Sequence, residues 1–474
     1  MNDSFAIPAW AWSGRRVAAV VLVLATIVYA PGLAGPFQFD DWWAIAGDER
    51  VQSLAAWWQA LPGIRPLLKL SYTLNLSLSS APWSLRLSNL AAHATNALLL
   101  WWLMRQWLPR LVPDRAAMPG TTKTRALAIA IALLFLLHPA ATEAVTYLSG
   151  RSVSLMATFY LLALCLLTRA QSDPGAKRWP WLAALAFAAA LAVRETAVTL
   201  PLAWLLLARG SGLGWRETWT PLRLVLAVLL LAVVAALLTP GYHSFFGWSL
   251  QTRGLGAQLL GQIDAHAYLL THPLPGIALN IDPDVRVPPA FETRHALWLL
   301  LAGGATAIAW RQRRSRPWLL FALAWYALHL APSNSLMPRF DLANDRHLYL
   351  ALPGPLLVFT LGLQTLRSRP LGLGLLLLVM LAAGLQTMRR NLDYRSELAL
   401  WQATVAASPG KARPWTNLGY ARQLQGDLDG AAAAYRCALA QDPAHRQAAW
   451  NLAAIAPGRV SPGGDDCTPT SVAD

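Results

Sequence analysis

Charge is scarce in this chain of 474 residues. Only 13% of its residues are charged, against roughly 25% in soluble globular domains, while 55% are hydrophobic and the mean hydropathy is +0.38. This composition excludes a soluble globular enzyme and predicts a membrane protein with several spans. The net charge of +15 does not indicate a nucleic-acid partner, because the Lys and Arg residues cluster in short loops between apolar segments. The positive-inside bias of membrane proteins produces this pattern.

Cysteine is scarce as well. Cys165, Cys437 and Cys467 are far apart in the sequence and predict neither a disulfide framework nor a metal site. His266 and His272 are too isolated to predict a zinc site. The chain also has no Walker loop and no dinucleotide-binding fingerprint, so nothing indicates ATP or NAD. We therefore expect no resident cofactor, and the sequence leaves open a divalent metal that acts together with an acid.

Apolar segments of helical length run through residues 1–390 and predict an all-α, polytopic membrane bundle. Basic clusters between the segments place the N-terminus in the cytoplasm. The segment 257–275 contains several polar residues, so we interpret it as a re-entrant or surface helix in a long outer loop, 240–294. About eleven crossings result, with a first outer loop at 35–86 and the C-terminus outside. The apolar segments are 17–34, 87–108, 125–139, 152–168, 180–193, 196–208, 221–239, 257–275, 295–310, 317–331, 347–366 and 370–388.

An acid pair, Asp40-Asp41, follows the first apolar segment and is flanked by aromatic residues. Aromatic side chains favour the membrane interface, whereas charge near hydrocarbon is costly and usually functional. One interpretation is a helix cap, since Asp is favoured at helix N-caps. The other is catalytic: one carboxylate acts as a general base toward a hydroxyl and the second orients it. Between the two, we favour Asp41 as the base.

Two further polar motifs fall on the same predicted outer face. Glu143 and Arg151 lie in a turn between two apolar segments, and Arg194-Glu195 joins two others. Arg151 and Arg194 are candidate phosphate ligands, because arginine forms bidentate phosphate contacts. The alternatives are a polar hairpin with a Glu143–Arg151 ion pair, and a Glu195 favoured by a helix dipole.

A third motif on this face precedes the last two apolar segments. It contains Arg346-His347 and Tyr349. These residues are either interfacial anchors or cations that hold a lipid phosphate leaving group as negative charge develops on it. We favour the second interpretation, because the predicted topology collects the otherwise unexplained charged motifs on one side of the membrane.

The composition becomes more polar after residue 390. A repeat of about 34 residues matches Ala406 with Ala440 and Pro409 with Pro443, the period of a tetratricopeptide repeat. We predict a tetratricopeptide-repeat domain at 391–456 and a disordered tail at 457–474. Its helices are expected near 396–407, 412–425, 428–441 and 445–455.

Taken in order, the motifs resemble the C-type superfamily of integral membrane glycosyltransferases. The resemblance is strongest to the transmembrane and tetratricopeptide repeat-containing protein O-mannosyltransferases and their bacterial relatives. It covers nearly the whole chain and rests on Phe39-Asp40-Asp41; Arg65-Pro66-Leu67; Leu70-Ser71-Tyr72; Leu74-Asn75; Asn89, His93 and Asn96; His138-Pro139; Thr142-Glu143-Ala144-Val145; Ser149-Gly150-Arg151; Glu195; Leu200-Pro201-Leu202; Arg346-His347-Leu348-Tyr349-Leu350; and the repeats.

The resemblance implies a sugar donor on a polyprenyl phosphate and an acidic base, Asp40 or Asp41, in the first outer loop. It also implies transfer to a hydroxyl with inversion, on the outer side of the cytoplasmic (inner) membrane. We expect a protein acceptor, bound through the repeats, and membrane lipid as the other partner. Transfer to a lipid or envelope glycan is one alternative. A transporter or assembly scaffold without chemistry is the other.

Overall fold

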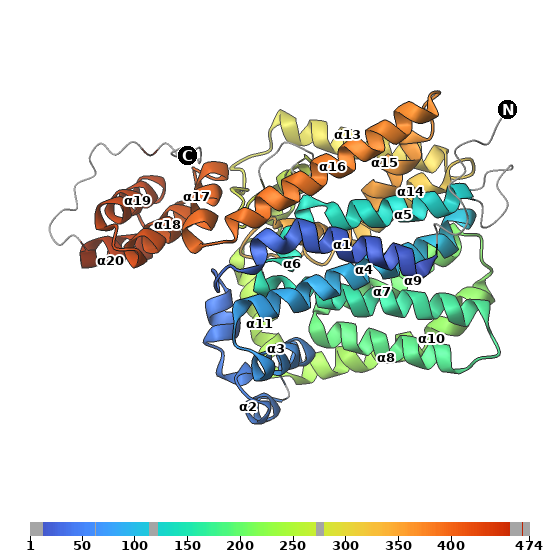
Figure 1. The fold of residues 1–474 in the computed structure, drawn as a ribbon, viewed down its shortest axis with the longest axis horizontal. Helices are drawn as coiled ribbons and strands as arrows, with labels where there is room; N and C mark the ends of the chain where they lie inside the picture. The colour runs from blue at the N-terminus through green and yellow to red at the C-terminus, as the bar shows by residue number, and fades with distance from the viewer. Residues whose placement is uncertain (1–12, 62, 113–121, 272–278, 456–466, 468–474) are drawn as a thin grey trace.

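The computed structural model describes residues 13–61, 63–112, 122–271, 279–455 and 467. All regular elements in these ranges are helical, so the prediction of an all-α fold is confirmed. The long helices lie side by side along one axis (Figure 1). They are α1 (Gly14–Leu33), α4 (Pro82–Leu111), α5 (Thr122–Leu137), α7 (Arg151–Ser172), α8 (Arg178–Val193), α9 (Leu200–Gly210), α10 (Trp215–Leu238), α13 (Thr293–Arg311), α14 (Pro317–Leu330), α15 (Pro353–Leu363) and α16 (Arg369–Asp393).

Several of these helices have the length and composition of membrane spans, which satisfy all backbone polar groups internally. By these two criteria, the described part of the chain has four such spans: Gly14–Leu33, Leu148–Ser172, Trp215–Leu238 and Arg369–Asp393. A helix pair that bends by 55° after Leu137 makes a fifth. Other apolar helices have only 10–17 residues. The chain is a membrane protein, and the number of eleven crossings stays a prediction.

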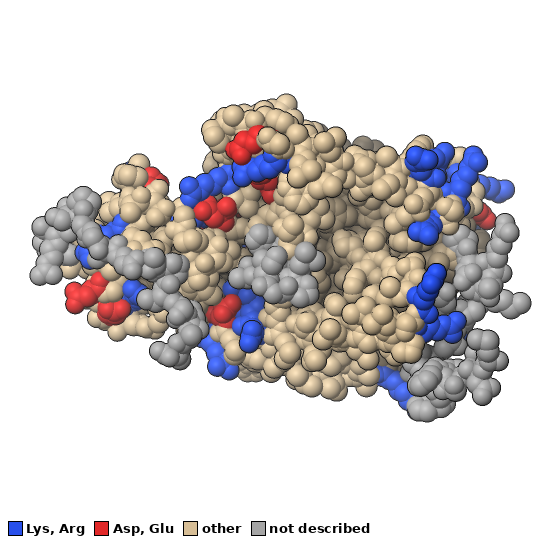
Figure 2. All heavy atoms as spheres, turned by 90° about the horizontal axis from the view of Figure 1, so that it is seen from above, with Lys and Arg blue, Asp and Glu red and all other residues tan. Residues whose placement is uncertain are grey.

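Charge divides the two ends of the bundle. Lys and Arg dominate the end where α1 begins, whereas acidic and basic residues mix toward the other end (Figure 2). The positive-inside bias predicts this asymmetry.

The end rich in acids is built from short helices and turns, where prolines interrupt the long apolar segments. Pro139 begins one such turn after α5, and Pro66 begins α3 after the left-handed Arg65. These short elements carry the predicted site motifs. They are η2 (Trp42–Ala46), η3 (Glu49–Val51), α2 (Leu54–Gln59), α3 (Pro66–Leu78), η4 (Pro139–Ala141), α6 (Thr142–Val145), η5 (Leu148–Gly150), η6 (Glu195–Thr199), α11 (Pro240–Thr252), α12 (Leu255–Thr271) and η7 (Asp345–Leu348).

Four helices follow α16 and extend beyond the acid-rich end of the bundle (Figure 1). They are α17 (Glu397–Ala407), α18 (Ala412–Leu424), α19 (Leu428–Gln441) and α20 (Arg446–Ile455), close to the expected ranges. Ser396 and Asp427 cap the first and third through their side chains, which accept hydrogen bonds from backbone N–H groups. The assignment of these helices to a tetratricopeptide-repeat domain stays a prediction.

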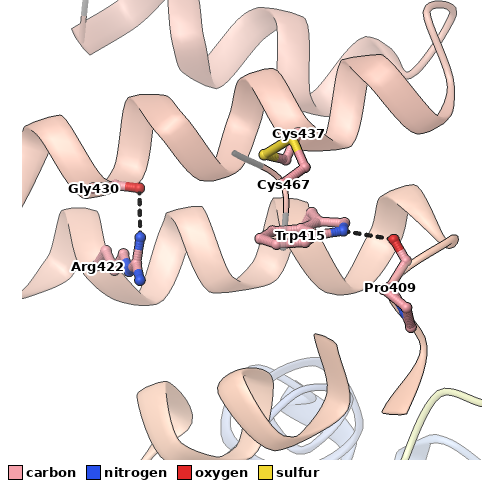
Figure 3. Close-up of a disulfide and its surroundings, with 6 residues drawn as sticks. All are labelled: Pro409, Trp415, Arg422, Gly430, Cys437 and Cys467. Carbon is pink, nitrogen blue, oxygen red and sulfur yellow. Dashed lines mark hydrogen bonds between the residues drawn. A yellow bond between two sulfur atoms is a disulfide. The ribbon is translucent and has the colours of Figure 1, made fainter. Parts of the chain in front are cut away.

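A disulfide joins Cys437 of α19 to Cys467, with the two Cα atoms 5.5 Å apart (Figure 3). The prediction that the cysteines form no disulfide was therefore wrong. Cys467 lies against α19 and next to Trp415 of α18. The spacing of the cysteines in the sequence does not show that the chain folds back to bring them together. The remaining residues of the predicted disordered tail lie outside the described part of the chain.

Candidate active site

The acid pair lies in a loop between α1 and η2, and its two carboxylates have different surroundings. Asp41 is fully buried. Its Oδ1 accepts hydrogen bonds from the backbone N–H and the hydroxyl of Ser149, at 2.8 and 2.7 Å. Its Oδ2 accepts one from the backbone N–H of Gln38 at 3.1 Å. Burial raises the pKa of Asp41 to about 7, although these hydrogen bonds oppose the shift. Asp41 thus holds the loop between α1 and η2, which we call the acid loop, against the turn at Ser149.

Asp40 is exposed. Its backbone N–H donates to the hydroxyl of Tyr147 at 3.2 Å, and the Tyr147 ring lies 5.9 Å from the Arg346 guanidinium. Burial lowers the pKa of Arg346, but the carboxylates of Glu143 and Asp40, together with Tyr147, hold it above its usual value. Asp40 is therefore the acid that both faces solvent and acts electrostatically on the cation beside it.

Two residues next to the site have left-handed backbone conformations. Phe39 has φ 52° and Arg65 has φ 54°, and no other non-glycine residue in the described ranges has a positive φ. Such conformations cost of order 1–3 kcal/mol and cluster at functional sites. Phe39 directly precedes the acid pair, and Arg65 directly precedes α3.

The turn that carries Ser149 requires a glycine. A Cβ on Gly150 would lie 2.1 Å from the backbone oxygen of Glu143, so any larger residue would push these two segments apart. Glu143 in turn accepts a hydrogen bond from the backbone N–H of Arg346 at 3.0 Å, and its second carboxylate oxygen lies 3.4 Å from the Arg346 side chain. The close approach at Gly150 thus links the acid loop, the Glu143 turn and Arg346.

Four arginines from three separate segments of the chain lie near one another beside this turn. Burial and its neighbours Arg65, Arg339 and Arg346 lower the pKa of Arg194. Arg65 forms a bidentate pair with Glu195, with N–O distances of 3.0 and 2.9 Å. The group is Arg65, Arg194, Arg339 and Arg346, which we call the arginine cluster. Glu195 pairs with Arg65 and Glu143 pairs with Arg346, whereas Arg194 and Arg339 have no ion-pair partner among the described residues, so the cluster suits an anion.

A pocket opens at the arginine cluster. Burial and the neighbouring arginines lower the pKa of His347 well below its usual value, so this ring is neutral at pH 7. Within the described residues, the buried Nε atoms of Arg339 and Arg346 and the Nδ1 atom of His347 have no hydrogen-bond partner. At the pocket, Arg346 and His347 therefore offer unpaired polar groups beside apolar side chains. It is lined by Val153, Met156, Arg194, Thr196, His329, Ser333, Arg346, His347 and Leu350.

Arg151 and Tyr349, both predicted to bind substrate, are instead part of the helical core. Every nitrogen of the Arg151 guanidinium donates to a protein oxygen, and the residue is only 3% exposed. Tyr349 is fully buried, and its hydroxyl bonds with His93 at 2.7 Å and Asn96 at 2.9 Å. The acceptors of Arg151 are Asn89 Oδ1, Asn75 Oδ1, Ser71 O and Leu85 O. Neither side chain lines the pocket.

No family model matches the chain. It is 26% identical over 442 residues to protein O-mannosyl-transferase TMTC3 of Mus musculus, which covers 83% of this chain and 45% of that protein. The chain is similar to the protein O-mannosyl-transferases. Over 143 residues it is 33% identical to protein O-mannosyl-transferase Tmtc1 of Drosophila melanogaster, covering 28% of this chain and 16% of that protein. The expected resemblance is confirmed, and the chain spans about half the length of the curated TMTC3 relatives it matches.

Among solved structures, the apo form of the Archaeoglobus fulgidus oligosaccharyltransferase matches with a TM-score of 0.45 and 12% identity. This match covers 90% of our chain and 60% of that chain.

The sequence predicts neither Arg65 nor Arg339 as a ligand-binding residue. Arg65 begins one of the motifs on which the resemblance to the O-mannosyl-transferases rests, which was the available signal. Arg339 lies only seven positions before Arg346 in the same polar stretch. Within the described residues, no group of three or more His, Cys, Asp or Glu side chains is arranged to hold a metal ion.

Proposed function

We propose that this chain is a membrane glycosyltransferase that moves a sugar from a polyprenyl-phosphate donor to an acceptor hydroxyl, with inversion, on the outer face of the membrane. One observation carries the proposal: the exposed carboxylate of Asp40 acts electrostatically on Arg346, which lines a pocket together with Arg194 and apolar side chains. The similarity to proteins named protein O-mannosyl-transferases supports the same reaction class.

In this mechanism Asp40 removes the proton from the acceptor hydroxyl. The hydroxyl oxygen attacks the anomeric carbon from the face opposite the phosphate, and the bond from that carbon to the phosphate oxygen breaks. The polyprenyl phosphate leaves with the electron pair of that bond. General base catalysis of this kind contributes about 10²–10⁴-fold. Positioning and charge stabilisation must supply the rest.

The arginine cluster receives the leaving phosphate. The unpaired Nε atom of Arg346 and the side chain of Arg194, which line the pocket, offer charge-assisted hydrogen bonds to its oxygens, and Arg339 adds positive charge beside them. Glu143 and Glu195 orient Arg346 and Arg65. His347, neutral at pH 7, can donate or accept one further hydrogen bond. Val153, Met156 and Leu350 provide an apolar surface for the lipid end of the donor.

Two observations favour the outer face and a protein acceptor. Disulfides form in oxidising compartments, so the Cys437–Cys467 bridge fits a C-terminal region outside the cytoplasm. The named activity of the relatives is O-mannosylation of protein, which favours mannose and a Ser or Thr hydroxyl. A lipid or envelope-glycan acceptor remains the second candidate for the same chemistry. A transporter is disfavoured, because Asp40 is exposed at one end and not buried midway along the bundle.

The test is sugar transfer by the purified full chain in liposomes. The donor is undecaprenyl-phosphate-mannose, and the acceptors offered in parallel are a Ser/Thr-rich peptide and a lipid extract. We expect labelled mannose on the peptide, in the anomeric configuration opposite to the donor. Label on the lipid alone would reassign the acceptor. No transfer to either acceptor, with donor in excess, would contradict the proposed function.

A further inference from the structure

The acid loop contacts the beginning of the C-terminal region at several points. Phe39, which precedes Asp40, packs against a tryptophan of α17, and the residues on either side bond to the same region. The contacts are Gln38 Nε2 to Tyr394 O (3.1 Å), Trp42 Nε1 to Glu397 Oε1 (3.0 Å), and the Phe39 and Trp401 rings, whose centroids are 5.2 Å apart. A Cβ on Gly35 would lie 2.0 Å from the oxygen of Tyr394, so the backbones nearly touch. The conformation of the acid loop therefore depends on residues far along the chain.

Arg413 at the start of α18 extends this contact to the arginine cluster. Its guanidinium donates to Asp341 Oδ1 at 2.8 Å, and Asp341 lies two residues after Arg339. The same guanidinium lies over two aromatic rings, 5.7 Å from the centroid of Phe39 and 5.1 Å from that of Phe340. One side chain thus contacts both the acid loop and the segment that carries Arg339.

A third segment, which contains Asp282, contacts Arg413 and Lys411. Asp282 is fully buried and ion-paired with both Arg413 and Lys411. Arg413 Nε donates to Asp282 Oδ2 at 2.6 Å, and Lys411 also binds Asp341 at 3.1 Å. A buried carboxylate is costly without such partners, so these two cations hold the segment firmly. Bidentate arginine contacts add geometric specificity that a single lysine contact lacks.

We propose that Arg413 is a positioning residue that fixes the acid loop relative to the arginine cluster, so that α17 and α18 are part of the active site. The functional consequence rests on the proposed glycosyl transfer. Asp40 and the arginines act on opposite sides of one bond, and misplacement by about 1 Å can cost on the order of 10²-fold in rate. The contrasting role for these helices is acceptor recruitment alone.

The test compares three variants of the full chain: Arg413→Ala, Asp341→Asn and Arg422→Ala. Asp341→Asn removes the negative charge that pairs with Arg413 and Lys411, while Asp282 keeps both its cations. This second variant tests the proposal even if Arg413→Ala fails to fold. Arg422→Ala is the matched control: this arginine of α18 donates to Gly430 O (Figure 3) and lies near Asp427, and no hydrogen bond or ion pair in the described part of the chain joins its side chain to the bundle. Two rates are measured with undecaprenyl-phosphate-mannose: transfer to a Ser/Thr peptide and hydrolysis by water.

We expect Arg413→Ala and Asp341→Asn to lower kcat for both reactions by the same factor, about tenfold or more. The double variant should be faster than the product of the two single effects predicts, because the Arg413–Asp341 pair is weakened or lost in both single variants. Arg413→Lys, which keeps the charge, should recover part of the rate. Arg422→Ala should keep wild-type rates. A loss of peptide transfer with unchanged hydrolysis would overturn the proposal in favour of acceptor recruitment.

Hydrogen exchange on the same proteins separates failure of this inference from failure of the proposed function. We expect faster backbone exchange at 36–47 and 338–347 in Arg413→Ala and Asp341→Asn, and wild-type exchange there in Arg422→Ala. Unchanged exchange in both test variants would overturn the positioning role, whatever the wild-type protein catalyses. Absence of sugar transfer by the wild type would overturn only the proposed reaction.

Discussion

Ser149 donates two hydrogen bonds to one oxygen of Asp41, from its backbone N–H at 2.8 Å and from its hydroxyl at 2.7 Å. The backbone N–H of Gln38 donates to the second oxygen, so both oxygens of the buried Asp41 carboxylate accept hydrogen bonds from the protein. A base must reach the proton that it removes. The geometry therefore favours Asp40 as the base and Asp41 as its support, which reverses the preference drawn from the sequence.

The Ser149 hydroxyl should contribute measurably to this support. Ser149→Ala removes one hydrogen bond to a buried carboxylate, so we expect a loss of about 1.5–3 kcal/mol in the free energy of unfolding. The measurement is thermal unfolding in detergent. Ser77→Ala is the control, because among the described residues this exposed hydroxyl of α3 bonds only to Leu74 O. Equal stability of the two variants would count against a charged, hydrogen-bonded Asp41.

The pKa of about 7 for Asp41 predicts a dependence of stability on pH. Because burial raises this pKa above its unfolded value of 3.8, the folded state binds more protons between the two values. The contribution of Asp41 to stability should therefore fall as pH rises from about 4 to about 7 and then level off. Asp41→Asn should remove this dependence. The measurement is the difference in unfolding free energy between wild type and variant across this pH range, and a difference independent of pH would contradict the assignment.

Activity should depend on pH in the opposite direction. Protonation of Asp41 replaces an acceptor with a donor and weakens its bonds to Ser149 and Gln38, so transfer should slow as the pH falls below about 7. An inflection near this pH in kcat, present in wild type and absent in Asp41→Asn, is the expected result. The same inflection in both proteins would assign it to another group.

The arginine cluster should matter for the chemical step more than for protein stability. We expect Arg194→Ala and Arg346→Ala to lower kcat on the order of 10²–10³-fold, because they remove groups that stabilise charge on the leaving phosphate. Arg313→Ala is the control, since this exposed arginine donates to Trp310 O and lies outside the pocket. Rates within twofold of wild type in both cluster variants would place the phosphate elsewhere.

Arg151 should behave as a structural residue. Its substitution by Lys leaves several of the four acceptors of its guanidinium without a donor in the core, so we expect a loss of about 3–5 kcal/mol in stability. The KM for the donor in the protein that still folds should match wild type. A stable Arg151→Lys protein with a raised donor KM would restore the phosphate-binding role predicted from the sequence.

The sequence predicts the helical elements well, because their signals are local. Apolar runs and turn residues indicate the bundle and the four helices after residue 390 without knowledge of tertiary contacts. The charge distribution also indicates that the site motifs share one end. Each of these features depends on the composition or spacing of neighbouring residues.

The parts that the sequence could not predict depend on long-range contacts. Arg65 meets Glu195 across 130 residues, and no local pattern shows that this arginine, but not Arg151, lies at the arginine cluster. Arg151 has the same charge and the same predicted face, and only its buried acceptors distinguish it. The return of Cys467 to Cys437 is a further case, with a separation of 30 residues.

The central claim is that Asp40 is the base of a sugar transfer. Its most direct test is the single-turnover rate of mannose transfer from undecaprenyl-phosphate-mannose to a Ser/Thr peptide by Asp40→Asn, with Asp264→Asn as a control carboxylate outside the pocket. The predicted result is a rate lowered by about 10²–10⁴-fold in Asp40→Asn, with the control at the wild-type rate. A wild-type rate in Asp40→Asn would contradict the claim.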